Sequence, residues 1–243
     1  MRRAFFAFFG CAFVAPSLIV VFSAGLSCGG STRETSADAG KDVLSDQYLI
    51  DRVRLPNPIN LGGPCDAVED TPPLLPPNHV AFGTPVDYDS NPPSSGPHYP
   101  IWAAYQAYTT PVDRRYYVHD LEHGAVDLLY NCNVSADGGT EVIDADLVDS
   151  GDGDAGPCPA VAAQLQAIID AFPSDPRCSA SNGDPRVRFV LTPDPLLDVP
   201  VAAAAWGWTY KAQCVDPTTL TQFTKDHYDQ GLEEICANGQ SQF

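Results

Sequence analysis

Prolines crowd the stretch between Leu55 and Pro100, and they restrict its structure more than any other feature of the chain does. Proline has no N–H donor, and it pushes the residue before it out of the helical region. We therefore expect this stretch to be mostly extended or looped, with His79 and His98 on loops. The prolines that carry this argument are Pro72, Pro73, Pro76, Pro77, Pro92, Pro93, Pro97 and Pro100.

Beyond the prolines, short apolar segments predict strands and helices. Strand formers dominate residues 116–118 and 126–130, and Gly124 predicts a turn or bulge between them. Further strands are predicted over 187–191 and 201–208. No internal repeat is present.

Two helices are predicted, one over 159–172 from its apolar spacing and one from Asp216-Pro217 to about Tyr228. His227 falls on the apolar side of the second helix, so we interpret it as a helix-face residue and not as a ligand. Together these elements predict an α+β fold. We expect a single compact domain with a small, mostly antiparallel sheet, about two helices, long Pro-rich loops and disulfide staples.

The N-terminus has the pattern of a targeting segment. Arg2 and Arg3 precede an uncharged apolar run, which predicts a signal peptide over residues 1–27. Cys28 stands where a bacterial lipoprotein carries its lipid, although an uncleaved anchor and a secreted protein are alternatives. Residues 28–50 are polar and predict a flexible tether to a globular domain over 51–243. We expect export and a lipid anchor in the bacterial cell envelope, facing the periplasm or the exterior.

Six cysteines remain once Cys11 and Cys28 are set aside, an even number that predicts up to three disulfides in an exported chain. Cys214 and Cys236 flank the second predicted helix and are a reasonable pair. No C-x-x-C pair is present, which argues against a redox motif or a thiolate zinc finger. The candidates are Cys65, Cys132, Cys158, Cys178, Cys214 and Cys236.

The chain is strongly acidic, with a formal net charge of −18. Such a charge argues against nucleic acid and against anionic membrane surfaces, so the membrane is expected as a partner only through the anchor at Cys28. Seven carboxylates lie in an acidic insert over 133–157, and its aspartates faintly resemble a calcium loop. Ala160 falls where such a loop needs its glutamate, so calcium is not expected there.

Histidines are few and clustered. Four of the five fall between His79 and His123, and two of them frame the sequence His119-Asp-Leu-Glu-His123. Imidazole is the commonest metal ligand, and Glu122 can bind a metal, orient a ligand or act as a base. H-x-x-E-H is also the signature of inverted zinc peptidases. The neighbouring strand formers and Gly124 argue against the helix that such a peptidase requires.

Three ordered motifs resemble the bacterial family known as domain of unknown function 3105. They are Pro92-Pro-Ser-Ser-Gly-Pro-His98, then His119-Asp-Leu-Glu-His-Gly124, and later Ala205-Trp-Gly207. The resemblance implies export, carries His98, His119, Glu122 and His123 across, and His79 less firmly. It assigns no activity. This chain departs from the family pattern at Asp120, where asparagine is usual, and at Trp208, where arginine is common; its cysteines and acidic insert look like additions.

The ligand types favour a mononuclear site for zinc or copper(II). We predict His98, His119 and His123 as ligands, and His79 as an optional further ligand. Glu122 is predicted either as a fourth ligand or as a hydrogen-bonding partner of a ligand, and it is the candidate catalytic residue. Trp102 and Trp206 are candidate walls of such a pocket.

Three classes of function remain open from the sequence. The first is a metal-binding envelope protein. The second is a metal-dependent hydrolase or oxidase, which needs an open coordination position and a cleft. The third is a non-catalytic interaction domain. The sequence predicts neither a particular protein partner nor a small-molecule substrate.

Overall fold

A six-stranded sheet forms the centre of the structure, a computed structural model that describes residues 58–134, 158–178 and 185–242. Its elements in chain order are β1 (Ile59–Gly62), β2 (Ala67–Asp70), α2 (Arg114–Glu122), β3 (Val126–Tyr130), α3 (Pro159–Ala171), β4 (Phe189–Pro193), β5 (Val201–Ala205), β6 (Trp208–Ala212) and α4 (Pro217–His227). No helix within these ranges has the length and apolar character needed to cross a bilayer.

The strands lie in the order β1-β2-β6-β5-β3-β4. Neighbours pair antiparallel except β3 and β4, which run parallel with Leu128 opposite Leu191. A parallel pair needs a crossover connection, and α3 lies between β3 and β4 in the chain and packs against both. The predicted α+β class is confirmed, with three described helices where about two were expected.

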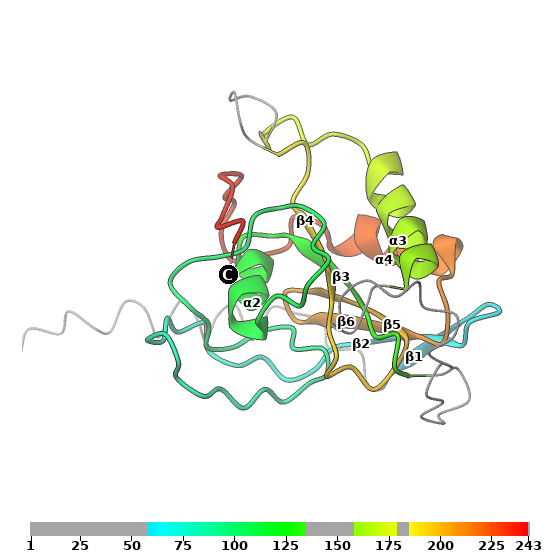
Figure 1. Ribbon diagram of the computed structural model, residues 1–243, viewed down its shortest axis with the longest axis horizontal. Coiled ribbons are helices and arrows are strands. Elements are labelled where there is room, and N and C mark those ends of the chain that lie inside the picture. The colour runs from blue at the N-terminus through cyan, green and yellow to red at the C-terminus, as the bar shows by residue number, and fades with distance from the viewer. Residues whose placement is uncertain (1–57, 135–157, 179–184, 243) are drawn as a thin grey trace, which may run out of the picture. The chain divides into compact units, whose positions relative to one another are not determined.

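Two helices cover one face of the sheet, and α2 with the Pro-rich loops covers the other (Figure 1). The alternation of β3 divides its side chains between these layers. Leu128 packs on the side of α3 and α4, and its neighbour Leu129 packs on the side of α2. Both are fully buried. The buried layer between β3 and α2 fixes the position of α2 on the sheet, and α2 carries the histidine motif.

The strand predicted over 116–118 is wrong, because these residues lie in α2. Asp113 caps the start of the helix by accepting a hydrogen bond from a first-turn N–H, and Gly124, at φ +80°, follows its end. The helix buries side chains at helical spacing against the sheet, which outweighs the weak strand preference of tyrosine and valine. These buried side chains are Tyr117, Val118 and Leu121.

Most other predicted elements are confirmed with shifted ends. The strand expected over 187–191 is β4, and both expected helices form as α3 and α4. The expected strand over 201–208 is instead two strands, β5 and β6, joined at Trp206 and Gly207. His227 is buried on α4, where its ring stacks on Trp208 and its Nε2 lies 3.1 Å from Glu69, as a helix-face residue should.

All six candidate cysteines are paired, as Cys65–Cys214, Cys132–Cys158 and Cys178–Cys236. The predicted pairing of Cys214 with Cys236 is wrong. Cys214 lies just before α4 and is bridged to Cys65, and the chain after α4 does not turn back along the helix to reach it. The chain after α4 continues toward α2, where Cys236 meets Cys178.

The predicted signal peptide over 1–27, Cys28, the predicted tether over 28–50 and most of the acidic insert, including its seven carboxylates, lie outside the described residues.

Candidate metal centre

The last turn of α2 presents the histidine motif. His119 and Glu122 are three residues apart and therefore share a face, and His123 is the C-terminal cap. The side chains of all three are buried. The helix that the surrounding strand formers argue against thus forms, and Gly124 ends it instead of weakening it.

The Pro-rich loops bring two further histidines to this turn. Residues around His79 and His98 form a short bridge in which Val80 N–H donates to the His98 carbonyl at 2.8 Å. The N–H of His98 in turn donates to the Asn78 carbonyl at 3.0 Å. As predicted, both histidines lie on loops. Tyr99 N–H then donates to the Arg115 carbonyl at 2.9 Å, which fixes the bridge against the start of α2.

The third motif of the chain also reaches this place. Gly207 N–H donates to the Ser94 carbonyl at 2.7 Å, and the ring of Trp206 meets that of His98 edge-on at 6.4 Å. Three motifs that are far apart in the sequence therefore meet beside one cluster of histidines.

Four side chains converge on one point: His79, His98, His119 and Glu122. Each offers a ligand atom, and these atoms all lie within 4.8 Å of one another. Ligands of a tetrahedral zinc ion lie about 3.3 Å apart, so shifts of roughly an ångström would complete such a sphere. This group could hold a metal ion.

Hydrogen bonds at the far side of two rings select which nitrogen faces the cluster. His98 Nδ1 lies 2.8 Å from the Gly96 carbonyl, and His119 Nδ1 lies 2.7 Å from the Tyr99 carbonyl. A carbonyl oxygen only accepts hydrogen bonds, so Nδ1 carries the proton in both rings. Nε2 of both rings then faces the cluster, which is the arrangement of a metal-ligating histidine with its outer hydrogen bond.

The electrostatics of the cluster favour a neutral ring at His119. Burial, reinforced by the neighbouring His98, lowers the pKa of His119 to about 4. Its Nε2 lies 3.9 Å from Oε2 of Glu122, and Nε2 of His98 lies 3.0 Å from the same oxygen. The His98 atom is buried and forms no hydrogen bond despite this short distance.

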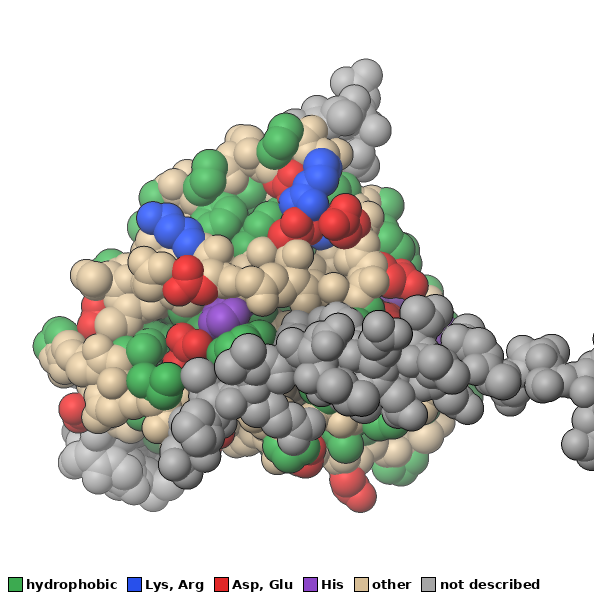
Figure 2. Space-filling view, turned by 180° about the vertical axis from the view of Figure 1, so that it is seen from behind, with side chains coloured by type: hydrophobic (Ala, Val, Ile, Leu, Met, Phe, Trp, Pro, Cys, Tyr) green, Lys and Arg blue, Asp and Glu red, His purple; other side chains and the backbone are tan. Residues whose placement is uncertain are grey.

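His79 is the exposed member of the group, whereas the other three are buried. Figure 2 shows histidine at the molecular surface, bordered by acidic and hydrophobic side chains. A metal held by this group would therefore have one ligand in contact with solvent.

His123, a predicted ligand, lies beside the group of four and not within it. Its ring centroid is 4.5 Å from that of His119, but its Nε2 lies 3.5 Å from Oε2 of Glu233. Burial and the adjacent His119 lower the pKa of His123 to about 3, so this ring is neutral as well.

Aromatic rings wall the cluster, as the sequence predicts for Trp102 and Trp206. Trp102 lies 5.2 Å from the His119 ring and meets the His123 ring edge-on at 4.6 Å. Its Nε1 donates to the Ala237 carbonyl at 3.0 Å, so the indole is fixed from the C-terminal segment.

The sequence did not predict a buried pair of carboxyl groups, one in α2 and the other in β3. Asp120 and Asp127 are fully buried, and neither oxygen of Asp127 has a hydrogen-bond partner. Burial raises the pKa of both, and Asp127 raises that of Asp120 further. The buried environment therefore favours the protonated form of both. The signal in the sequence is Asp127 alone inside the apolar run of β3.

Other candidate places are less suitable for a metal. Asp175, Cys178 and Cys236 lie together, but both sulfurs are in a disulfide. A groove of about 890 Å³ near the start of α2 is lined by segments around Tyr88, Arg114 and Leu196 and by none of the four candidate ligands.

The chain belongs to the family described as Protein of unknown function (DUF3105), whose model matches residues 79–147 and 157–239. The match covers His79, His98, His119 and Glu122, so the converging group lies within the family domain. No curated protein and no solved structure matches the chain.

Proposed function

We propose that this protein binds one divalent metal ion, zinc or copper(II), through His79, His98, His119 and Glu122. One observation carries the proposal. The ligand atoms of these four residues all lie within 4.8 Å of one another, and Nε2 of His98 lies only 3.0 Å from a carboxylate oxygen of Glu122. The Gly96 carbonyl holds a proton on Nδ1 of His98, so Nε2 points at that oxygen, and a proton or a metal ion between the two atoms makes the contact favourable.

The donor set supports zinc or copper(II) over copper(I). Histidine nitrogen and carboxylate oxygen suit these ions, whereas copper(I) prefers thiolate and thioether ligands. The chain has a single methionine, at its first residue, and the six cysteines outside the N-terminal segment are in disulfides.

Binding is favoured over catalysis because four protein donors would fill a tetrahedral sphere. Catalytic zinc keeps one position for water, beside a cleft. Here His79 would occupy the fourth coordination position. The groove near the start of α2 is lined by none of the four ligands. A metal-dependent hydrolase or oxidase with Glu122 as its catalytic residue would require His79 to leave the ion. A non-catalytic interaction domain is the function that remains if no ion binds.

We further propose that the protein is exported and anchored in the envelope through a lipid on Cys28. Three disulfides support an oxidising compartment, since cytosolic proteins rarely keep them. Fatty-acid labelling of the expressed full-length chain and of Cys28→Ala tests the anchor. Label on both chains, or on neither, would contradict it.

The metal proposal is tested by mass-spectrometric metal content of protein purified from an oxidising compartment without a histidine tag. The wild type should carry near-stoichiometric zinc or copper, and His119→Ala should carry almost none. His123→Gln is the matched control, because His123 is the adjacent histidine outside the group of four, and its metal content should stay near that of the wild type. Absence of metal from the wild type, even after incubation with both ions, would refute the proposal.

A further inference from the structure

The chain after α4 runs along the end of α2 that carries the candidate ligands. We refer to residues 228–240 as the strap. Asp229 N–H donates to the Gly124 carbonyl at 2.8 Å, and Glu233 N–H donates to the Glu122 carbonyl at 2.9 Å. The last carbonyls of a helix lack partners within it, so the strap supplies donors at the end of α2.

Gly231 lets the strap lie close to the end of α2, because it has no side chain. A Cβ atom at Gly231 would collide with the Glu122 carbonyl oxygen and with the Gly124 nitrogen. Only a residue without a side chain fits at that contact. The strap thus lies directly against the backbone of a candidate ligand.

The far end of the strap holds the aromatic wall of the site. Gln240 N–H donates to the Trp102 carbonyl at 2.8 Å, and Ala104 N–H donates to the Gln240 carbonyl at 2.8 Å. The Trp102 indole also donates to the Ala237 carbonyl. Since Trp102 packs against His119 and His123, movement of the strap would release both the end of α2 and this wall.

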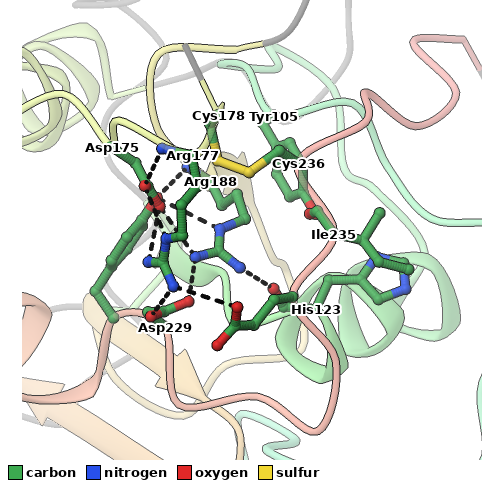
Figure 3. A network of polar contacts seen from close by, with 11 residues as sticks. Tyr105, His123, Asp175, Arg177, Cys178, Arg188, Asp229, Ile235 and Cys236 are labelled. Carbon is green, nitrogen blue, oxygen red and sulfur yellow. Dashed lines mark hydrogen bonds and ion pairs between the residues drawn. A yellow bond between two sulfur atoms is a disulfide. The ribbon is translucent and has the colours of Figure 1, made fainter. Parts of the chain in front are cut away.

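One covalent bond and a cluster of charges hold the strap down. Cys236 is bridged to Cys178, and Asp229 pairs with Arg177 and Arg188 (Figure 3). Arg188 is fully buried and also donates to the His123 carbonyl at 2.5 Å. Figure 3 shows the disulfide next to the two arginines, with Asp229 of the strap paired to them on one side and His123 on the other. The disulfide therefore secures the part of the strap that contacts α2.

We infer that the strap is a clasp that retains the metal, closed by the Cys178–Cys236 disulfide. This inference rests on the proposed metal site. The strap supplies none of the four ligands; its residues are positioning residues that hold α2 and Trp102 in place. A clasp of this kind slows exchange of the ion without changing its coordination.

The test compares zinc release from the full-length chain with and without the clasp. Wild type and Cys178→Ser/Cys236→Ser are loaded with zinc and mixed with a chromophoric chelator in a stopped-flow instrument. Release from the double variant should be faster by roughly tenfold or more, since a tether of this kind restrains local opening. Cys132→Ser/Cys158→Ser removes a different disulfide, outside the strap, and should release zinc at the wild-type rate.

Cobalt(II) substitution reports the coordination of the ion separately from its release rate. The visible spectrum of the cobalt form should be the same in wild type and in Cys178→Ser/Cys236→Ser, because the ligands are unchanged. Gly231→Ala, which keeps every disulfide, should likewise release zinc faster with an unchanged cobalt spectrum, and it decides the case if the double variant does not fold.

The experiment distinguishes failure of the proposed metal site from failure of the clasp. A wild type that binds no zinc refutes the proposed function. A wild type that binds zinc, with equal release rates in the clasp variants, refutes the clasp alone. A changed cobalt spectrum would also refute it, because the strap would then affect the coordination itself.

Discussion

His98 and Glu122 face each other across 3.0 Å inside the protein, one from a Pro-Gly loop and the other from the last turn of α2. Gly96 fixes the proton of His98 on the far nitrogen, so the near nitrogen and the carboxylate both act as acceptors. Only a shared proton or a metal ion makes this contact favourable. Metal binding and the stability of the metal-free protein should therefore respond in opposite ways to changes in this pair.

Glu122→Gln should separate these two effects. The amide keeps the shape of the side chain and can donate a hydrogen bond to Nε2 of His98, so the metal-free protein should be at least as stable as the wild type. Metal affinity should fall by more than about a hundredfold, because losing a hydrogen-bonding partner of a ligand already costs 10–100-fold. Calorimetric titration with zinc measures the affinity, and a thermal melt in chelator measures the stability. Unchanged affinity would show that Glu122 is not a ligand.

Zinc should stabilise the folded protein through the group of four. At a hundredfold excess over its Kd, a ligand adds about 2.7 kcal/mol, which raises the Tm of a domain of this size by about 5–10 °C. The shift should vanish in His119→Ala and persist in His123→Gln, as differential scanning fluorimetry can measure. Loss of the shift in both variants would make His123 a ligand, as the sequence alone predicts, and would argue against the present grouping.

The site was partly predictable, because its residue types and motifs are visible in the sequence. What the sequence does not give is the helix at 114–122, since its tyrosines and valine prefer strands when burial is ignored. On a strand, His119 and Glu122 would point to opposite faces, whereas on a helix they share one. That single difference brings Glu122 into the group and leaves His123 beside it.

The disulfide pattern shows a second limit of the same kind. Cys214 and Cys236 are close in the chain, but which cysteines meet depends on where the strap goes after α4. The strands β3, β4 and β5 were easier to predict, because their apolar runs are local patterns, whereas β1 and β2 were not predicted as strands. Parallel pairing of β3 with β4 rests on the α3 crossover and has no local signal.

Asp127→Asn should make the protein more stable at high pH than the wild type. Burial raises the pKa of Asp127, so the folded state keeps a proton that the unfolded state loses above about pH 4. Wild-type stability therefore falls as the pH rises from that point toward the raised pKa. The asparagine has no such proton, so its advantage should grow between pH 4 and pH 8. Urea unfolding in chelator across this range measures the slope; parallel curves would show that Asp127 is not protonated in the folded state.

Asp175→Asn should have the opposite pH dependence. Burial alone would raise the pKa of Asp175, but hydrogen bonds from Arg177 and Tyr228 outweigh it and lower the pKa to about 2. A lowered pKa contributes stability that is complete above the unfolded value of about 4 and is lost as the pH falls toward 2. The substitution should cost on the order of 2–3 kcal/mol at pH 7, because it also removes one of the carboxylates that pair with the buried Arg188.

Urea unfolding of Asp175→Asn at pH 7 and at pH 2.5 measures this difference. The gap between variant and wild type should shrink at the lower pH, where the wild-type carboxylate is largely protonated in the unfolded state and begins to be protonated in the folded one. Asp170→Asn is the matched control, since Asp170 is an exposed carboxylate on α3 whose hydrogen bond is to Gln166, and its gap should be small at both pH values. A gap for Asp175→Asn that does not change with pH would mean that the aspartate acts by packing alone and not by its charge.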